Sequence, residues 1–230
     1  MSKIKKKPVI FFLSKSGAGK DTQAEFLIKK YGYAYMNTGG LIRAVAKTKT
    51  YESREMHKIE KKGKFVPTLN VVCLWKVELM KIIKNYKRVK GIVFVGSPRK
   101  LSEAMLLRDF FLNWPDAVNF FKLVPMEVFI SDKEVIKRLG ARRQCENCSK
   151  FFSYFKEHMA FKVCDKCGGK LMRRKDDSVS GIKSRLKEYR NHVLPVIKYF
   201  KKIDKVIKIN GEQSIEKVHK DINLALKNIL

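Results

Sequence analysis

The chain has 230 residues, 45% of them hydrophobic, which is enough to bury one full core and one small inserted module. No stretch approaches about eighteen uncharged apolar residues, and the start, MSKIKKKP, lacks the apolar segment and cleavage site of a secretory signal, so we expect a cytoplasmic protein without a membrane partner. Lys and Arg number 51 against 22 Asp and Glu, a net charge of +29 that favours polyanionic partners, although lysines spread over solvated faces give the same total.

Short apolar runs rich in β-branched residues alternate with helical patterns along the chain. The expected strands are Val9–Leu13, Gly91–Gly96, Val128–Ile130 and Lys205–Ile209. The expected helices are Lys20–Lys30, Val71–Arg88, Ser102–Phe111, Asp132–Leu139 behind the capping pattern of Ser131 and Glu134, Ser178–His192 and Ile215–Ile229. The first two strands are almost continuously hydrophobic, as strands buried on both faces of a parallel sheet are. The alternation predicts an α/β fold.

A loop of small residues, SKSGAGKDT, follows the first expected strand. The P-loop pattern is G-x-x-x-x-G-K-[ST], whereas this loop has Ser14 for the first glycine and Asp21 where the hydroxyl belongs. Its backbone N–H groups can still turn toward a phosphate, and the next helix offers its positive end there. Lys20 then supplies a charge to the β- and γ-phosphates. The carboxylate of Asp21, in the first helical turn, interacts favourably with the helix dipole and need not face the phosphate. The alternative to a phosphate-binding loop is an ordinary glycine-containing βα turn.

Four of the five cysteines form two CxxC pairs separated by fifteen residues: Cys145, Cys148, Cys164 and Cys167. That spacing predicts a zinc ribbon, whereas two disulfides would require an oxidising compartment for which there is no signal. Gly168 suits the tight turn after the fourth ligand. Segment 142–175 interrupts the α/β alternation and carries ten basic and three acidic side chains, so it reads as an inserted module. The fifth cysteine, Cys73, is expected to be a small buried hydrophobe.

These motifs resemble those of the adenylate kinases. The loop is similar to GxPGxGKGTQ of that family, in which the hydroxyl comes two positions after the lysine, so Thr22 takes that role. MNTGGLIRA from Met36 resembles the family's STGDLLR, GKFVP from Gly63 its GKLVPD, and GSPRKLSEA from Gly96 its DGFPRTxxQA. The stretches KRLGARRQCENC, RRKDD and SRLKEY resemble its zinc-bearing lid and the flanks of that lid. The likeness extends over almost the whole chain.

The resemblance implies transfer of the ATP γ-phosphoryl group to a nucleoside monophosphate, AMP in the first instance. It implies a P-loop NTPase-type parallel sheet flanked by helices, with an inserted zinc-ribbon lid. The implied segments are a core of 1–37, 68–141 and 176–230, a monophosphate-binding domain of 38–67 and a lid of 142–175. One structural Zn²⁺ and a Mg²⁺ bound with ATP are the implied metals, and a monomer is expected.

The matching positions imply a role for each site residue. The implied catalytic cations are Lys20, Arg99, Arg142, Arg174 and Arg185. The implied ATP-binding residues are Gly17, Ala18, Gly19, Lys20, Asp21, Thr22, Arg138, Arg142, Phe151, Phe152 and Gln213. The implied monophosphate-binding residues are Thr38, Arg43, Lys64, Phe65, Val66, Gly96, Arg99, Glu103, Arg174 and Arg185. In these sets Arg138 stacks on the ATP base, and Phe151 and Phe152 flank its ribose. The four paired cysteines hold the zinc.

Besides Asp21, which stands where the family usually has glycine, three positions depart from the family pattern. Gly40 and Val95 stand where the family has aspartates that help hold the water shell of magnesium, which leaves the ion to the nucleotides and Thr22, with Asp21 as a candidate helper. Glu103 replaces a base-reading glutamine; when ionised it can accept a hydrogen bond from an exocyclic amine but cannot donate one to adenine N1. A kinase for another base is therefore one alternative. A nucleic-acid-binding P-loop protein with a zinc ribbon is another, although the arginines fall at kinase positions.

Overall fold

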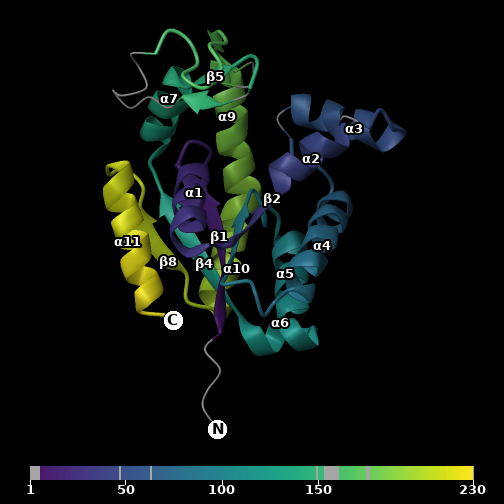
Figure 1. Ribbon diagram of the computed structural model, residues 1–230. Coiled ribbons are helices and arrows are strands. Elements are labelled where there is room, and N and C mark those ends of the chain that lie inside the picture. Colours follow the sequence, from purple (N-terminus) through teal and green to yellow (C-terminus); the bar gives the residue numbers. More distant parts are fainter. Residues whose placement is uncertain are drawn as a thin grey trace.

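The computed structural model describes residues 6–46, 48–62, 64–148, 150–152, 161–174 and 177–229. Its centre is a five-stranded parallel sheet in the order β2-β3-β1-β4-β8 (Figure 1). The strands are β1 Lys7–Ser14, β2 Ala34–Asn37, β3 Ile92–Val95, β4 Phe121–Phe129 and β8 Ile207–Asn210. The described helices are α1 Lys20–Tyr31, α2 Thr38–Ala46, α3 Tyr51–Lys61, α4 Thr68–Lys84, α5 Leu101–Asn113, α6 Pro115–Phe120, α7 Asp132–Ala141, α9 Val179–Glu188, α10 Leu194–Ile203 and α11 Ile215–Lys227. The predicted α/β fold is confirmed.

The central strand β1 is buried on both faces, and its residues alternate between two cores. Val9, Phe11 and Leu13 pack with α4, α5 and α10. Ile10 and Phe12 pack with α1, α7 and α11 on the opposite face. Because helices cover both faces, no position in this strand needs a polar side chain, which explains the continuous apolar run.

Two elements extend well beyond their predicted bounds. Strand β4 begins at Phe121, whereas the prediction began at Val128. The prediction was too short because Pro125 and the buried Glu127 interrupt the apolar pattern of the strand. Glu127 accepts a hydrogen bond from Lys201 at 3.1 Å. The helix predicted to end at His192 continues instead through a π-helical turn, η2 Tyr189–Val193, into α10. The wider turn lies just before Pro195, where a regular helix would meet the proline ring.

Strand β2 and helices α2, α3, α6 and α10 were not predicted from the apolar pattern, because most are short or carry mixed polarity. Cys73 is exposed, so its predicted burial is wrong. Helix α4 buries Val71, Trp75 and Leu79 on one side, and Cys73 lies between them in sequence and therefore on the other side.

Two parts project beyond the carboxyl ends of the strands. One is the helical arm of α2 and α3; the other carries a small antiparallel sheet, β6-β5-β7, with strands Phe151–Phe152, Arg143–Cys145 and Leu171–Met172 (Figure 1). The described residues include no helix that is both long and apolar enough to cross a membrane.

Candidate active site

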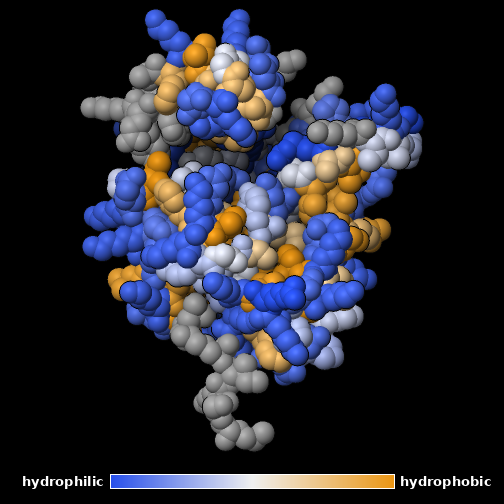
Figure 2. All heavy atoms as spheres, viewed as in Figure 1, coloured by the Kyte–Doolittle hydropathy of each residue, from blue (hydrophilic) through white to orange (hydrophobic). Residues whose placement is uncertain are grey.

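A cleft of about 380 Å³ lies at the carboxyl ends of the parallel strands. Figure 2 shows the surface hollowed between the α2–α3 arm and the part that bears the small sheet. The walls come from the segments that follow β1, β2, β3 and β8, and from both projecting parts. The strand order reverses beside β1, since β3 and β2 lie on one side of it and β4 and β8 on the other. Ligands of open α/β sheets bind at such a switch point.

The glycine-rich loop has the backbone geometry of a phosphate-binding loop. Gly17 and Gly19 have φ values of 86° and 87°, which side-chain-bearing residues rarely adopt. A Cβ on Gly17 would also lie 3.2 Å from Cδ2 of Leu139. Gly19 is the N-cap of α1 and has no side chain that could accept a hydrogen bond from the first N–H groups of the helix. These N–H groups can therefore bind an anion.

The structure brings five cationic side chains from separate parts of the chain to the same cleft: Lys20, Arg99, Arg142, Arg174 and Arg185. Burial, followed by the neighbouring arginines Arg142, Arg174 and Arg99, lowers the pKa of Arg185 to about 9. Burial also lowers the pKa of Lys20, which Asp21 partly opposes. The cations therefore crowd one another at a cost in free energy, and a polyanion bound among them would relieve it.

Asp177 holds two of these arginines in place. Its carboxylate accepts two hydrogen bonds from Arg142, at 2.8 and 2.7 Å, and one from Arg185 at 2.9 Å. The Asp177 side chain is fully buried, and its backbone carbonyl accepts a further bond from Arg173. Such planar, charge-assisted pairs fix the direction of each guanidinium. Asp177 is a positioning residue that our sequence reasoning did not assign, although it lies in the RRKDD stretch.

The four paired cysteines form the predicted metal centre. Their Sγ atoms all lie within 4.8 Å of one another, and none is in a disulfide. Four sulfurs around one zinc, each at about 2.3 Å, would lie about 3.8 Å apart. The donor set therefore fits a tetrahedral Zn²⁺ after small shifts. Gly168 has the predicted positive φ, 69°, at the turn after the last cysteine.

Zinc is expected to stabilise the lid rather than to take part in the reaction, because no cysteine is among the described residues that line the cleft. We expect one equivalent of zinc by elemental analysis. Cys145→Ser should lower Tm markedly and nucleotide affinity little, since a module this small has almost no core without its metal. Cys73→Ser, on the exposed side of α4, is the matched control and should change neither. Four freely titrating thiols in a metal-free protein of full stability would contradict this assignment.

Residues 12–205 match the family described as adenylate kinase. The chain belongs to the adenylate kinase family. Its curated relatives include the adenylate kinase of Treponema denticola, 34% identical over 208 residues that span 90% of this chain and 93% of that protein. That of Thermodesulfovibrio yellowstonii is 32% identical over 216 residues, 93% of this chain and 96% of the relative. The adenylate kinase of Archaeoglobus fulgidus is 29% identical over 226 residues, which span 96% of this chain and 98% of that protein.

Family membership makes this chain a nucleoside monophosphate kinase, a phosphotransferase. Nothing in the comparisons favours the nucleic-acid-binding alternative. Of the site residues implied by the resemblance, all those outside the metal centre line the kinase cleft except Phe152.

The predicted acceptor side of the kinase cleft contains one buried polar atom without a partner. Thr38 is 2% exposed, and its Oγ1 makes no hydrogen bond among the described residues. The guanidinium of Arg99 lies 5.0 Å from the centre of the Phe65 ring, and Val66 is buried beside it. Arg43 and Lys64 also line this side, together with the backbone of Gly96.

The two adjacent phenylalanines of the predicted donor side, Phe151 and Phe152, lie in different surroundings. Phe151 lines the cleft between Arg142 and Arg174, each 5.3 Å from its ring centre. Phe152 is 1% exposed and packs with Cys145 and Cys164 in the lid core. Neighbouring residues of a strand point to opposite faces, so Phe151 faces the cleft while Phe152 faces the lid core. The predicted contact of Phe152 with the ribose stays a prediction.

The side chain of Arg138, which is predicted to stack on the ATP base, makes hydrogen bonds to three different segments. Its guanidinium bonds to Glu134 at 2.8 Å, to the Gly211 carbonyl at 2.8 Å and to the Gly17 carbonyl at 3.4 Å. It thereby ties α7 to the phosphate loop and to the turn after β8. Gln213, on that same turn, donates a hydrogen bond to Asp221 at 2.8 Å and lines the cleft.

Several cleft residues were not predicted. Gln23 lines the donor side with an unpartnered, buried side-chain oxygen, while its Nε2 donates to the Ile215 carbonyl at 3.0 Å. Asn37 and Glu60 line the acceptor side. Apart from the position of Asn37 at the carboxyl end of β2, these polar residues carry no local sequence signal of this role.

Proposed function

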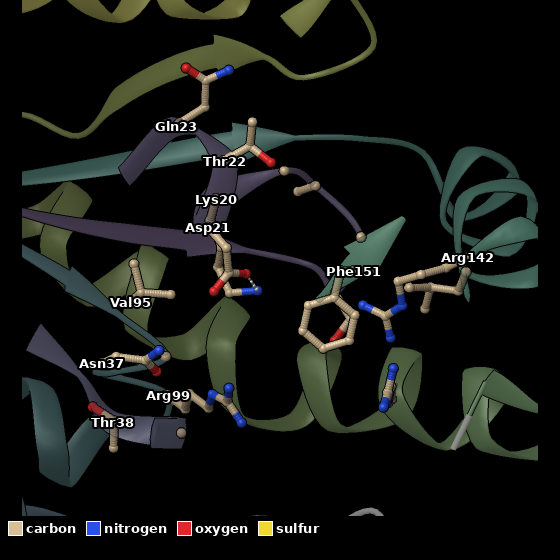
Figure 3. A pocket seen from close by; sticks show the side chains of 18 of the residues that line it. Lys20, Asp21, Thr22, Gln23, Asn37, Thr38, Val95, Arg99, Arg142 and Phe151 are labelled. Carbon is tan, nitrogen blue, oxygen red and sulfur yellow. Dashed lines mark ion pairs between the residues drawn. The ribbon is translucent and has the colours of Figure 1, made fainter. Parts of the chain in front are cut away.

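We propose that this kinase transfers the γ-phosphoryl group of ATP to AMP and forms two molecules of ADP. The observation that carries the proposal is the convergence of Lys20, Arg99, Arg142, Arg174 and Arg185 on one cleft beside the glycine-rich loop. Figure 3 shows three of them, Lys20, Arg99 and Arg142, around this cleft. Phosphoryl transfer requires little covalent help from the protein. It requires that both phosphate groups be aligned and that their negative charge be stabilised as it moves.

On the donor side, the backbone of Gly17–Thr22 and the Lys20 ammonium bind the ATP phosphates. Arg138 and Gln213 border the base, and Phe151 contacts the ribose from the lid. Mg²⁺ bound with ATP would neutralise part of the charge on the β- and γ-phosphates. The Thr22 hydroxyl and the Asp21 carboxylate both line the cleft beside Lys20, and oxygen donors of this kind suit that ion.

On the acceptor side, Arg43 and Arg99 bind the AMP phosphate. The unpartnered hydroxyl of Thr38 is free to meet the base, and the backbone of Lys64–Val66 frames it. We assign 38–67 as the monophosphate-binding domain and 142–175 as the lid. When both close, Arg142, Arg174 and Arg185 surround the migrating phosphoryl group and water is excluded, so that the phosphoryl group passes to AMP rather than to water.

A coupled assay tests the proposal directly. The zinc-loaded protein is given Mg²⁺ and ATP with each of AMP, GMP, CMP and UMP in turn, and diphosphate formation is measured. We expect the highest kcat/KM with AMP. Turnover that prefers another monophosphate would keep the reaction class but reject AMP as the acceptor; failure to form diphosphate from any of the four would reject the proposed reaction.

Glu103 bears most directly on the choice of acceptor base. Its Oε2 accepts hydrogen bonds from the Ser97 hydroxyl at 2.7 Å and from the Arg99 N–H at 2.8 Å. The side chain is 2% exposed yet lines the cleft. One carboxylate oxygen is thus committed to the loop that carries Arg99, and the base can meet only the remaining one.

Glu103→Gln should strengthen AMP binding about tenfold, equivalent to about 1.4 kcal/mol. The amide oxygen can still accept from Ser97 and Arg99, while the new NH₂ group donates to adenine N1, which the carboxylate cannot do. Isothermal titration with AMP and GMP measures the change, and thermal melting verifies that the loop is intact. If neither the AMP affinity nor the base preference changes, Glu103 serves only to hold the Arg99 loop.

A further inference from the structure

Asp21 occupies the phosphate-binding region with its side chain toward the cleft. Its carboxylate lies 3.7 Å from the Lys20 ammonium, and 60% of the side chain is exposed on the cleft side of α1 (Figure 3). Its negative charge acts on several cations around the cleft: it opposes the burial that lowers the pKa of Lys20, of Arg99 and of Arg174. The carboxylate therefore does not merely interact with the dipole of α1 from outside.

A carboxylate at this point repels a polyphosphate. In the structure Lys20 is its partner, but Lys20 is also the cation that the bound phosphates attract. Once Lys20 turns to the phosphates, Asp21 loses this ion pair and is left close to several negative oxygens. A divalent cation between the carboxylate and the phosphates converts this repulsion into attraction on both sides.

The other described carboxylates of the cleft are not available for that task. Glu103 accepts bonds from Ser97 and Arg99, and Glu60 lies on α3 in the acceptor arm. Across from Asp21, the ends of β2 and β3 present Asn37 and Val95, which are paired in register (Figure 3). Neither side chain carries a charge, and the side-chain oxygen of Asn37 already accepts the N–H of Gly40 at 3.0 Å.

We propose that Asp21, together with the Thr22 hydroxyl, holds the Mg²⁺ that enters with ATP, either directly or through the water shell of the ion. This inference rests on the proposed function, because it requires ATP phosphates at the loop. Mg²⁺ in nucleotide sites is held by one or two carboxylates together with phosphate oxygens and water, and Asp21 supplies the carboxylate at this site.

The test is a comparison of nucleotide binding with and without the ion. ATP is titrated calorimetrically into the zinc-loaded enzyme, with Mg²⁺ or without added Mg²⁺ after its selective removal, for the wild type and for Asp21→Asn. In the variant we expect metal-free ATP to bind more tightly, because a repulsive charge is gone. The factor by which Mg²⁺ improves ATP affinity should fall about tenfold. Mn²⁺ paramagnetic resonance, which requires no turnover, should show weaker ion binding to the ATP complex of Asp21→Asn.

Glu25→Gln is the matched control. It removes the same charge one turn further along α1, outside the cleft, and should leave both ATP affinities and the Mn²⁺ spectrum unchanged. Asp21→Glu, which restores the charge, should recover part of the Mg²⁺ effect, and thermal melts establish that each variant is folded. An unchanged Mg²⁺ factor in Asp21→Asn would overturn the role of Asp21 while leaving the kinase assignment intact. Wild-type protein that binds no ATP under either condition would overturn the proposed function as well.

Discussion

Lys20→Ala should lower kcat about a hundredfold or more. Lys20 is expected to bind the ATP phosphates, and its side chain is 16% exposed, so that water cannot readily replace it. Loss of a preorganised charge of this kind costs on the order of 3 kcal/mol of transition-state stabilisation. We expect a loss of similar size for Arg99→Ala on the acceptor side. Steady-state kinetics with ATP and AMP measure both effects.

The matched control is Lys29→Ala. Lys29 lies in the last turn of the same helix, is exposed, and is outside the cleft, so its removal should leave kcat within about twofold of the wild type. Thermal melts of both variants separate loss of catalysis from loss of folding. Wild-type turnover in Lys20→Ala would show that the loop is not a phosphate-binding site.

Asp177→Ala should have the largest effect on stability. Asp177 is fully buried and compensates the charges of Arg142 and Arg185, whose side chains are only 19% and 17% exposed. Removing one partner of a buried charged group leaves the others uncompensated, which costs about 3–5 kcal/mol of the free energy of unfolding. Denaturant unfolding measures this loss. The same variant should lower kcat, because the two guanidinium groups lose the direction that the carboxylate imposes.

Two further variants separate the contributions at this site. Asp177→Asn keeps one oxygen acceptor but removes the charge, so it should lose less stability than Asp177→Ala. Glu55→Ala breaks an exposed ion pair with Lys58 on α3 and should cost less than about 1 kcal/mol. If Asp177→Ala were as stable and as active as the wild type, the buried cluster would not position the arginines.

Much of the fold could be predicted because the signals are local. The apolar run Val9–Leu13 predicts a strand buried on both faces. The observed strand β1 contains this run and extends two residues before it and one after it. The capping pattern of Ser131 predicts the start of α7, where its hydroxyl accepts the N–H of Glu134 at 3.2 Å. Elements whose hydrophobic pattern is broken were missed or shortened. Strand β4 is the clearest case, because its buried Glu127 is compensated by Lys201, which lies on a distant helix.

The sequence predicted which residues belong to much of the candidate site. It did not predict how their side chains are arranged. Family-like motifs named the cationic side chains around the cleft, and the structure brings them together from α1, from the loop after β3, from the lid region and from α9. No motif indicated that Phe152 would turn into the lid core, or that the Arg138 guanidinium would bond to Glu134 and to the carbonyls of Gly17 and Gly211. Both depend on neighbours that only packing supplies.

By itself, the sequence determined the α/β class, the phosphate loop and the four-cysteine metal centre. Each of these follows from residues within one element or one short spacing, where chain geometry limits the outcomes. Only the tertiary structure decided that Asp177 binds Arg142 and Arg185, and that Asp21 lines the cleft beside Lys20. The direction of a charged side chain depends on which partners the fold brings within a few ångströms, and those partners come from distant parts of the chain.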